Sequence, residues 1–115
     1  IAGTVMDMPF RGKADIITKD GCIIDLKTTT NISKFKYSAY NFSYDLQCYV
    51  YCQLFNIGYQ NFKFIAIDKD TLVPKFCDIS EEFYKSGENK CAKAIKEYKE
   101  NVNLDLNEYL QKDTL

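Results

Sequence analysis

The stretch Cys22-Ile23-Ile24-Asp25-Leu26-Lys27-Thr28 decides how this chain is interpreted, because it places an acid and an amine at the end of an apolar run. In a β-strand, residues two apart point to the same face of the sheet. Asp25 and Lys27 therefore project together, whereas Leu26 faces the other way. An acid and an amine held side by side can bind a divalent cation and help to activate a water molecule. The stretch thus predicts a reactive pair on one face of a strand.

A second acid, Asp15, stands ten residues earlier, across an Asp20-Gly21 turn. This turn predicts a hairpin in which a strand over residues 11–19 pairs with a strand over residues 22–28. Asp15 would then lie beside Asp25 near the same end of the hairpin. Two simpler interpretations stay open: Asp15 as an ordinary acid on an edge strand, and Asp25 with Lys27 as a charge pattern that faces water.

The rest of the pattern alternates short strands with helices, which is typical of a mixed α/β core. The expected elements are a strand over residues 2–8 ended by Pro9, a short helix over residues 32–40, a buried helix over residues 44–56 closed by Gly58, strands over residues 59–68 and 72–79, and a final helix. Pro74 in the last of these strands indicates the edge of a sheet.

The final helix is expected to be amphipathic. Asp78-Ile79-Ser80-Glu81 has the spacing of a capping box. From Glu88 onward, apolar residues recur at helical spacing with lysines and glutamates opposite them; they are Cys91, Ala94, Ile95, Tyr98 and Val102.

Length and composition favour one folded domain over residues 1–115. Hydrophobic residues make up 46% of the chain, and no tract rich in glycine, proline or serine suggests a linker. The apolar runs are too short to span a bilayer, so we expect no membrane association and a cytoplasmic protein. The chain opens inside an expected strand rather than with a start methionine, and we expect it to be a fragment of a longer chain.

The five cysteines favour reduced thiols packed as small hydrophobic residues, because their number is odd and each lies in an apolar segment. The chain has no histidine and no CxxC pair, which argues against a zinc or iron–sulfur site. The absence of histidine also removes the usual general base. Any catalysis must rely on carboxylates, lysine and a metal ion.

A net charge of −1 neither indicates a nucleic-acid-binding protein nor excludes one. Arg11, Lys34 and Lys36 are candidates for phosphate contacts, although a solvated face is the favoured explanation of the two lysines. An aromatic series over residues 35–44 can stack on unpaired bases or pack in a core or oligomer contact.

Four pieces of the sequence together resemble the PD-(D/E)XK nuclease superfamily, and within it the phage and RecB-like exonucleases, especially the exonuclease VIII (RecE-type) group. The pieces are Gly12-Lys13-Ala14-Asp15, Ile23-Ile24-Asp25-Leu26-Lys27-Thr28-Thr29, Tyr44-Asp45-Leu46-Gln47 and the Q-x-x-x-Y pattern from Gln47 to Tyr51. They cover about the first sixty residues. Each motif alone is weak, and their order gives the resemblance its specificity.

The resemblance implies a role for each matching residue. Asp15 and Asp25 would bind Mg²⁺ or Mn²⁺, with the backbone carbonyl of Leu26 as a further ligand, since hard cations prefer oxygen. Lys27 would position or help to deprotonate the attacking water. Gln47 would orient the lysine, the water or the phosphate, and Tyr51 would lie one helical turn further on the same face. A structural role of Gln47 and Tyr51 in a helix interface is the alternative.

The resemblance also implies a restriction-endonuclease-like core, in which helices flank a central mixed sheet, and a Mg²⁺-dependent exonuclease that hydrolyses duplex DNA ends in phage-type recombination or repair. The expected partners are DNA, a single-strand annealing protein and further copies of the chain. The superfamily usually carries another acid or a histidine on a helix before the first strand. No such helix is expected here, so we expect one metal ion rather than two. The alternatives are a RecB-like nuclease module of a helicase–nuclease and a catalytically silent DNA-binding or assembly module.

Overall fold

A mixed four-stranded sheet forms the centre of the fold in the computed structural model, which describes residues 1–101. The strands lie in the order β3 (Ile16–Ile17), β4 (Ile23–Thr29), β5 (Phe62–Asp68) and β6 (Pro74–Asp78). The central pair β4 and β5 is parallel, and the two outer pairs are antiparallel. The expected mixed α/β fold class, consistent with a PD-(D/E)XK-like core, is confirmed.

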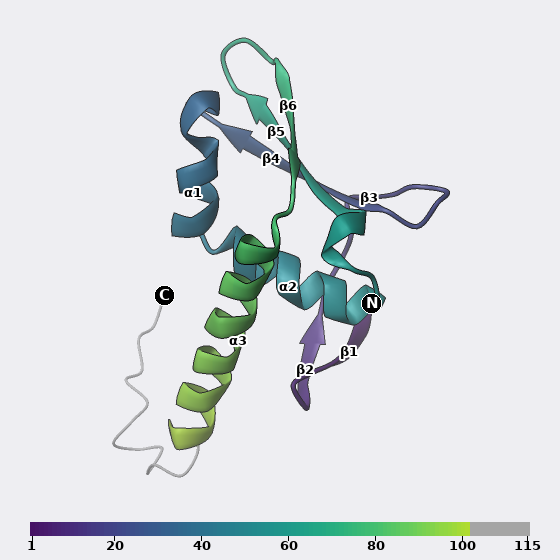
Figure 1. Cartoon of the computed structure of the whole chain (residues 1–115), viewed down its shortest axis with the longest axis vertical. Coiled ribbons are helices and arrows are strands. Elements are labelled where there is room, and N and C mark those ends of the chain that lie inside the picture. The colour runs from purple at the N-terminus through teal and green to yellow at the C-terminus, as the bar shows by residue number, and fades with distance from the viewer. Residues whose placement is uncertain (102–115) are drawn as a thin grey trace, which may run out of the picture.

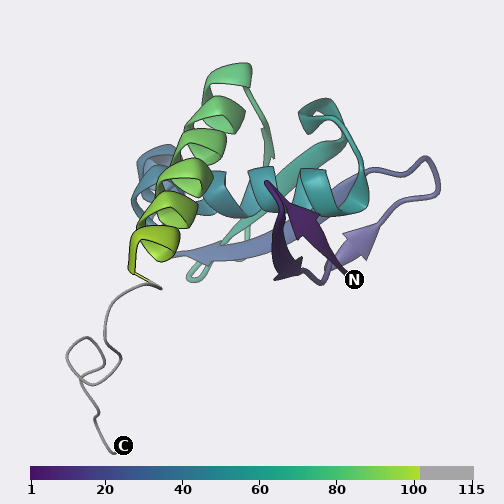
Figure 2. The ribbon, with the colours of Figure 1, turned by 90° about the horizontal axis from the view of Figure 1, so that it is seen from below.

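The helices connect the strands and cover one side of the sheet. The chain crosses from β4 to the parallel strand β5 through η1 (Ile32–Lys34), α1 (Phe35–Asn41), α2 (Tyr44–Phe55) and η2 (Tyr59–Asn61). The long helix α3 (Glu81–Asn101) follows β6 and packs on α2. Figures 1 and 2 show α1, α2 and α3 on the same side of β4. No helix within residues 1–101 is long and apolar enough to cross a membrane.

The main core lies between the sheet and these helices. Alternate residues of β4 and β5 face it, and Ile23, Phe62 and Phe64 are almost fully buried there. Phe64 meets Phe35 from α1 and Phe83 from α3 edge to face. Burial of these rings removes large apolar areas from water, which fixes the sheet under the helices.

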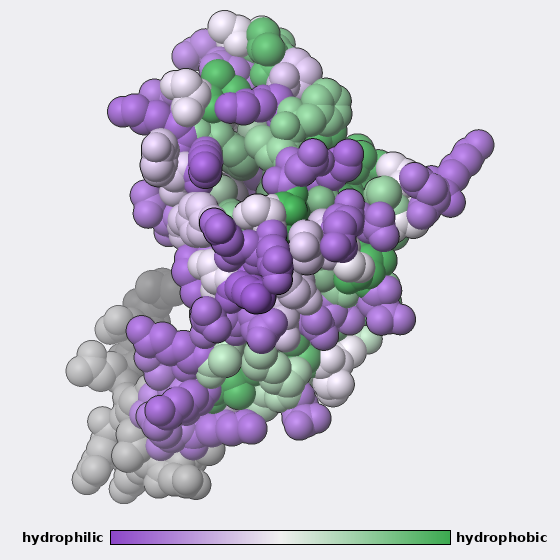
Figure 3. Space-filling view, viewed as in Figure 1, coloured by the Kyte–Doolittle hydropathy of each residue, from purple (hydrophilic) through white to green (hydrophobic). Residues whose placement is uncertain are grey.

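The opposite face of the sheet is more open. Leu26, Ile65 and Phe76 are neighbours across β4, β5 and β6 on this face, and both Leu26 and Phe76 are exposed. Figure 3 shows hydrophobic surface over the upper part of the molecule, where the β5–β6 hairpin lies, and mainly hydrophilic surface over α3.

The N-terminal segment forms a hairpin of its own, so the prediction of one strand ended by Pro9 was wrong. Strands β1 (Ala2–Val5) and β2 (Met8–Arg11) are antiparallel, and Pro9 lies within β2 opposite Thr4. Met6 and Asp7 form the turn with positive φ angles of 51° and 63°. The turn was missed because these residues carry none of the usual glycine or asparagine signal.

The predicted hairpin around Asp20-Gly21 is confirmed, with one strand shorter than expected. Gly21 has a φ of 86°, and the Thr18 and Cys22 backbones pair across the turn. Only Ile16 and Ile17 of the expected strand over residues 11–19 pair with β4. The second expected hairpin is also confirmed, and Pro74 lies in the edge strand β6.

Two helix boundaries differ from the prediction. Asn56, with a φ of 54°, ends α2 in place of Gly58. The Ser80 hydroxyl, rather than Asp78, accepts the hydrogen bond from the Phe83 N–H at the start of α3. Asparagine tolerates the left-handed conformation, and serine is as good an N-cap as aspartate, so Asn56 can end α2 and Ser80 can begin α3.

The amphipathic character of α3 is confirmed only in part. Phe83, Cys91 and Ile95 are buried, whereas Ala94 and Tyr98 are exposed. Val102, the last member of the predicted stripe, lies outside the described residues.

A polar cluster inside the helical layer joins α2 to α3. The Asp45 carboxylate is fully buried and accepts hydrogen bonds from the Ser86 hydroxyl at 2.6 Å and the Lys90 ammonium at 2.9 Å. Gly87 lies between these donors, and a Cβ there would approach the Asp45 carbonyl oxygen to 2.0 Å. A side chain at this position would therefore force the two helices apart.

The close approach at Gly87 predicts that Gly87→Ala destabilises the protein by about 1–3 kcal/mol, as expected for overpacking, despite the better helix propensity of alanine. Asn89→Ala on the exposed side of the same helix is the matched control and should be neutral or slightly stabilising. Urea unfolding followed by circular dichroism measures both. Equal stability of the Gly87→Ala variant and the wild type would contradict the close packing of α2 on α3.

Candidate active site

The Asp25 carboxylate lies inside the core rather than at the surface. It faces the helices from the middle of β4, between Ile23 and Lys27 on the same side of the strand, and is only 3% exposed. A buried carboxylate is costly unless charged or polar partners surround it. The interpretation of Asp25 as part of a solvated charge pattern is therefore excluded.

Lys27 is held beside Asp25 by three partners. Its ammonium nitrogen lies 3.0 Å from Asp25 Oδ2, donates a hydrogen bond to Gln47 Oε1 at 2.7 Å, and stands 4.2 Å above the centre of the Tyr44 ring. The ring face attracts the cation and restricts its position. The side chain keeps 18% of its surface exposed, so the amine is fixed and still reachable from solvent.

Gln47 links the two members of this pair. From the first turns of α2, its Nε2 donates to Asp25 Oδ1 at 3.2 Å while its Oε1 accepts from Lys27. The amide orientation follows from the chemistry of its partners, because a carboxylate accepts and an ammonium donates. Gln47 thus contacts the acid and the amine directly, in addition to its place in the helix.

Asp15 meets the same group from the neighbouring segment. Asp15 immediately precedes the short strand β3, and its Oδ2 accepts a hydrogen bond from the Leu26 N–H at 2.9 Å. The carboxylate takes the place of a backbone acceptor on that edge of β4. Within a strand the N–H and C=O of one residue point to the same neighbour, so the Leu26 carbonyl also faces the Asp15 side.

The oxygen atoms gathered here suit a hard divalent cation. Asp25 Oδ2 is buried and makes no hydrogen bond, although it lies 3.0 Å from the Lys27 ammonium nitrogen, and it can still accept a ligand. No group of three or more histidine, cysteine, aspartate or glutamate side chains within residues 1–101 is placed to hold a metal ion. Mg²⁺ in proteins commonly takes one or two carboxylates and completes its shell with water and substrate phosphate. Asp15 and Asp25, with the Leu26 carbonyl, fit that pattern for one ion.

The surroundings raise the pKa of Asp25 above its ordinary value. Burial is the largest cause, since it disfavours the charged carboxylate; the ion pair with Lys27 lowers the pKa, and the nearby Asp15 carboxylate raises it. A cation bound beside Asp25 would offset the negative charge that burial disfavours.

Tyr51 is not part of this group. Its hydroxyl accepts a hydrogen bond from the Lys13 N–H at 3.4 Å, and its ring lies against Gly12, where a Cβ would approach to 2.9 Å. No hydrogen bond joins Tyr51 to Asp25, Lys27 or Gln47 in the described part of the chain. Tyr51 instead supports the backbone that leads into Asp15.

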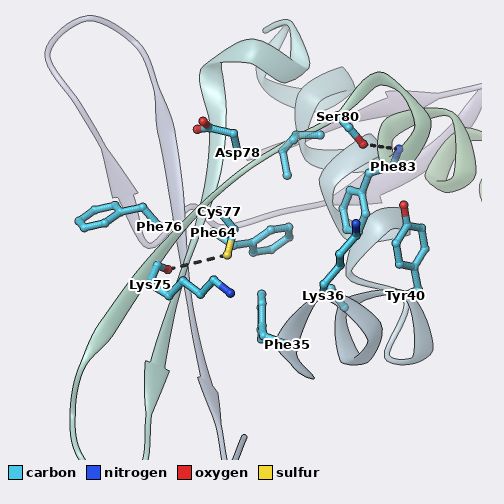
Figure 4. Close-up of a pocket in the computed structure, with 12 residues that line it drawn as sticks. Phe35, Lys36, Tyr40, Phe64, Lys75, Phe76, Cys77, Asp78, Ser80 and Phe83 are labelled. Atoms are coloured by element: carbon cyan, nitrogen blue, oxygen red, sulfur yellow. Dashed lines mark hydrogen bonds between the residues drawn. The ribbon is translucent and has the colours of Figure 1, made fainter. Parts of the chain in front are cut away.

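Apart from Tyr44, which stacks on Lys27, the other predicted contact residues lie outside the cluster. Arg11, Lys34 and Lys36 are exposed. In the aromatic series, Phe35 is buried, Tyr40 and Tyr44 are half-buried, and Tyr37 and Phe42 are exposed. A hollow of about 350 Å³ between β6, α1 and α3 contains Phe35, Phe64 and Phe83 together with the side chains of Lys36 and Lys75 (Figure 4). None of the predicted catalytic residues lines it.

The cysteines behave as the composition predicted. All five are free thiols, and Cys48, Cys52 and Cys91 are buried. A hydrogen bond with Cys52, together with burial, raises the pKa of Cys48, so this thiol stays neutral.

Two features of the site region were not predicted from the sequence. One is the stacking of Lys27 on Tyr44, and the other is the Asp45–Lys90 ion pair, which anchors the start of α2 two residues before Gln47. Asp45 in the first helical turn was the available signal, but its partners come more than forty residues later.

The comparison with protein families supports the PD-(D/E)XK-like fold. The family model described as "PDDEXK-like domain of unknown function (DUF3799)" matches residues 1–107. The chain belongs to this PDDEXK-like family. No curated protein matches the chain. The family description suggests a nuclease-like fold and, with it, a divalent metal, without naming an activity or a substrate for the DUF3799 domain.

The raised pKa of Asp25 gives a prediction for stability. The folded protein holds this proton more tightly than the unfolded chain, so wild-type stability falls as pH rises from below 3.8 through the folded pKa. Asp25→Asn removes this loss. We expect the metal-free variant to melt at a higher temperature than the wild type at pH 7, with the difference shrinking as pH falls toward 3.8.

Asp68→Asn is the control of opposite sign. Hydrogen bonds from the Thr71 and Asp70 N–H groups lower the pKa of Asp68, so this variant should lose stability at neutral pH. Thermal unfolding across pH measures both variants. An Asp25→Asn variant less stable than the wild type at pH 7 would show that Lys27 and Gln47 more than compensate for the burial of the charge.

Proposed function

We propose that this domain is a metal-dependent phosphodiesterase that cleaves DNA. Within this class, we propose that it is an exonuclease of the RecE or RecB type, which hydrolyses DNA at duplex ends. The observation that carries the proposal is the network in which Gln47 bridges the buried Asp25 carboxylate and the Lys27 ammonium, with the Asp15 carboxylate on the adjoining edge. A structural ion pair has no need of a second acid that raises the pKa of the first.

The carboxylates would hold the cation. Asp15 and Asp25 are the side-chain ligands available, and the Leu26 carbonyl is a further one. When bound, Mg²⁺ or Mn²⁺ supplies positive charge for the phosphate oxygens and makes a water more acidic. Because Asp25 binds its proton more tightly than usual, cation binding should weaken as the solution becomes more acidic.

Lys27 acts on the substrate directly in this proposal. Its ammonium donates a hydrogen bond to Gln47 and forms an ion pair with Asp25, and the Tyr44 ring limits its movement. A further N–H can donate to a phosphate oxygen or to the attacking water, and the positive charge offsets the negative charge that develops on the phosphate. With no histidine in the chain, this amine is the donor that lies beside the acid.

Gln47 is a positioning residue. It does not need to touch the substrate, because its amide sets the separation of Lys27 and Asp25. Its Nε2 donor also favours the charged carboxylate, which opposes the effect of burial. This contact explains why a glutamine, with one donor and one acceptor end, suits this position in α2 better than an acid or an apolar residue.

The test is cleavage of end-labelled linear duplex DNA by the wild type and Lys27→Ala in Mg²⁺ or Mn²⁺. We expect kcat to fall by about 10²–10³-fold in the variant, since a preorganised donor to the transition state is lost. Lys63→Ala is the matched control, because this lysine lies on β5, where it forms only a surface ion pair with Asp78. The control should cleave like the wild type.

Two results would contradict the proposal. Metal-dependent cleavage unchanged in Lys27→Ala would remove the amine from the reaction. DNA binding by the wild type without cleavage in either metal would favour a catalytically silent DNA-binding module of the same fold. An assay with closed circular DNA beside linear DNA separates an exonuclease, which needs ends, from an endonuclease.

The role of Gln47 has its own prediction. Gln47→Ala should lower kcat with little change in KM, and should move the acidic limb of the pH–rate profile to higher pH, because Asp25 loses a donor. Gln53→Ala is the control on the same helix, where the amide donates to the Tyr84 hydroxyl at 2.7 Å. A purely structural Gln47 would lower stability without moving the pH profile.

A further inference from the structure

A pocket of about 430 Å³ lies next to the proposed active site, where the parallel strands β4 and β5 end beside α1 (Figure 1). Ligands of open α/β sheets commonly bind beyond the carboxyl ends of parallel strands. The pocket combines hydroxyl groups, aromatic rings and one amine; the residues that matter are Thr29, Thr30, Ser38, Phe42, Tyr44 and Lys69.

The pocket begins where the active site ends. Asp25, Lys27 and Thr29 are successive residues on one face of β4, so Thr29 lies about 6–7 Å beyond Lys27 along the strand. The Tyr44 ring contacts the Lys27 ammonium and also lines the pocket. A DNA strand with its scissile phosphate at Lys27 would therefore place the neighbouring nucleotide in this pocket.

Phe42 provides an apolar surface at the pocket. Its ring is 67% exposed, and its centre lies 5.8 Å from that of Tyr44 with an interplanar angle of 36°. The backbone of Phe42 is fixed at the end of α1, where its N–H donates to the Ser38 carbonyl at 2.8 Å. An exposed ring held in this way can stack on an unpaired base.

Lys69 provides the positive charge. It follows β5 directly, and its backbone N–H donates to the Thr29 carbonyl at 2.9 Å, which joins the ends of the two parallel strands. Its side chain lines the pocket and forms no ion pair with any residue from 1 to 101. An unpaired amine beside threonine hydroxyls suits a phosphate group.

We propose that this pocket binds the nucleotide adjacent to the scissile phosphate, with its base stacked on Phe42 and its phosphate contacted by Lys69 and the threonine hydroxyls. This inference rests on the proposed nuclease function and adds the ligand of a subsite to it. The stacked base must be unpaired, so the pocket takes single-stranded DNA or the frayed end of a duplex.

Binding of fluorescent single-stranded DNA in EDTA tests the pocket separately from cleavage. Phe42→Ala should weaken binding by about 5–100-fold, which corresponds to the loss of one stacked base. Lys69→Ala should reduce the slope of log K against log salt by about one unit, because one phosphate contact is lost. Both changed side chains are exposed, and melting curves check that the variants fold.

The matched controls lie outside the pocket. Tyr37→Ala removes a ring on α1 that is 69% exposed, and Lys93→Ala removes a lysine on α3. Neither residue lines the pocket, so both variants should bind like the wild type. An oligonucleotide with an abasic site at the stacked position should bind the wild type as weakly as normal DNA binds Phe42→Ala, with no further loss when the two changes are combined.

The outcomes separate this inference from the proposed function. If the wild type cleaves DNA, but Phe42→Ala and Lys69→Ala bind like their controls, the subsite is overturned and the nuclease proposal stands. If the two variants lose affinity although no cleavage occurs in Mg²⁺ or Mn²⁺, the pocket is supported and hydrolysis is overturned. Failure of the wild type to bind single-stranded DNA overturns the subsite.

Discussion

The buried carboxylate of Asp25 is the constraint on which the arrangement of this domain depends. A charge inside an apolar layer is tolerated only with partners that hydrogen-bond or balance it. Here those partners are Lys27 on the same strand and Gln47 on α2, whereas the Asp15 carboxylate, just before β3, opposes the charge on Asp25. Gln47 joins α2 to β4, and Asp15 joins the start of β3 to the Leu26 backbone, so the polar contacts and the packing of the sheet support each other.

The helical layer contains a second buried aspartate, Asp45, which is also surrounded by polar partners. Asp45 is as deeply buried as Asp25, but Lys90 and Ser86 satisfy its carboxylate with short hydrogen bonds. Asp25 differs because one of its oxygens makes no hydrogen bond and a second acid stands nearby. A satisfied buried ion pair suits a structural junction, whereas an incompletely satisfied acid in contact with a fixed amine suits a site that binds a cation and substrate. The two aspartates thus show how one residue type serves stability or chemistry according to its partners.

Much of the site was predictable because it rests on local periodicity. The alternation of a strand placed Asp25 and Lys27 on one face, the Asp20-Gly21 turn paired the strand with its predecessor, and helical spacing put Gln47 on a helix that follows. The features that were not predicted depend on tertiary contacts or on an unusual backbone conformation. Met6 and Asp7 turn with positive φ without a glycine, and Tyr51 faces the Gly12–Lys13 backbone rather than the acid. The contacts of Tyr44 with Lys27 and of Asp45 with Lys90 join residues 17 and 45 positions apart, which no periodicity encodes.

The most direct measurement of the central claim is an anomalous difference map from a crystal of the wild-type protein soaked in Mn²⁺. We expect one strong peak within ligand distance of both the Asp15 and Asp25 carboxylates, and we expect Lys27 and Gln47 to stay in contact with each other. The same soak of Asp25→Asn should lose the peak. Density for Mn²⁺ elsewhere on the protein and none between these two carboxylates at saturating metal would contradict the account.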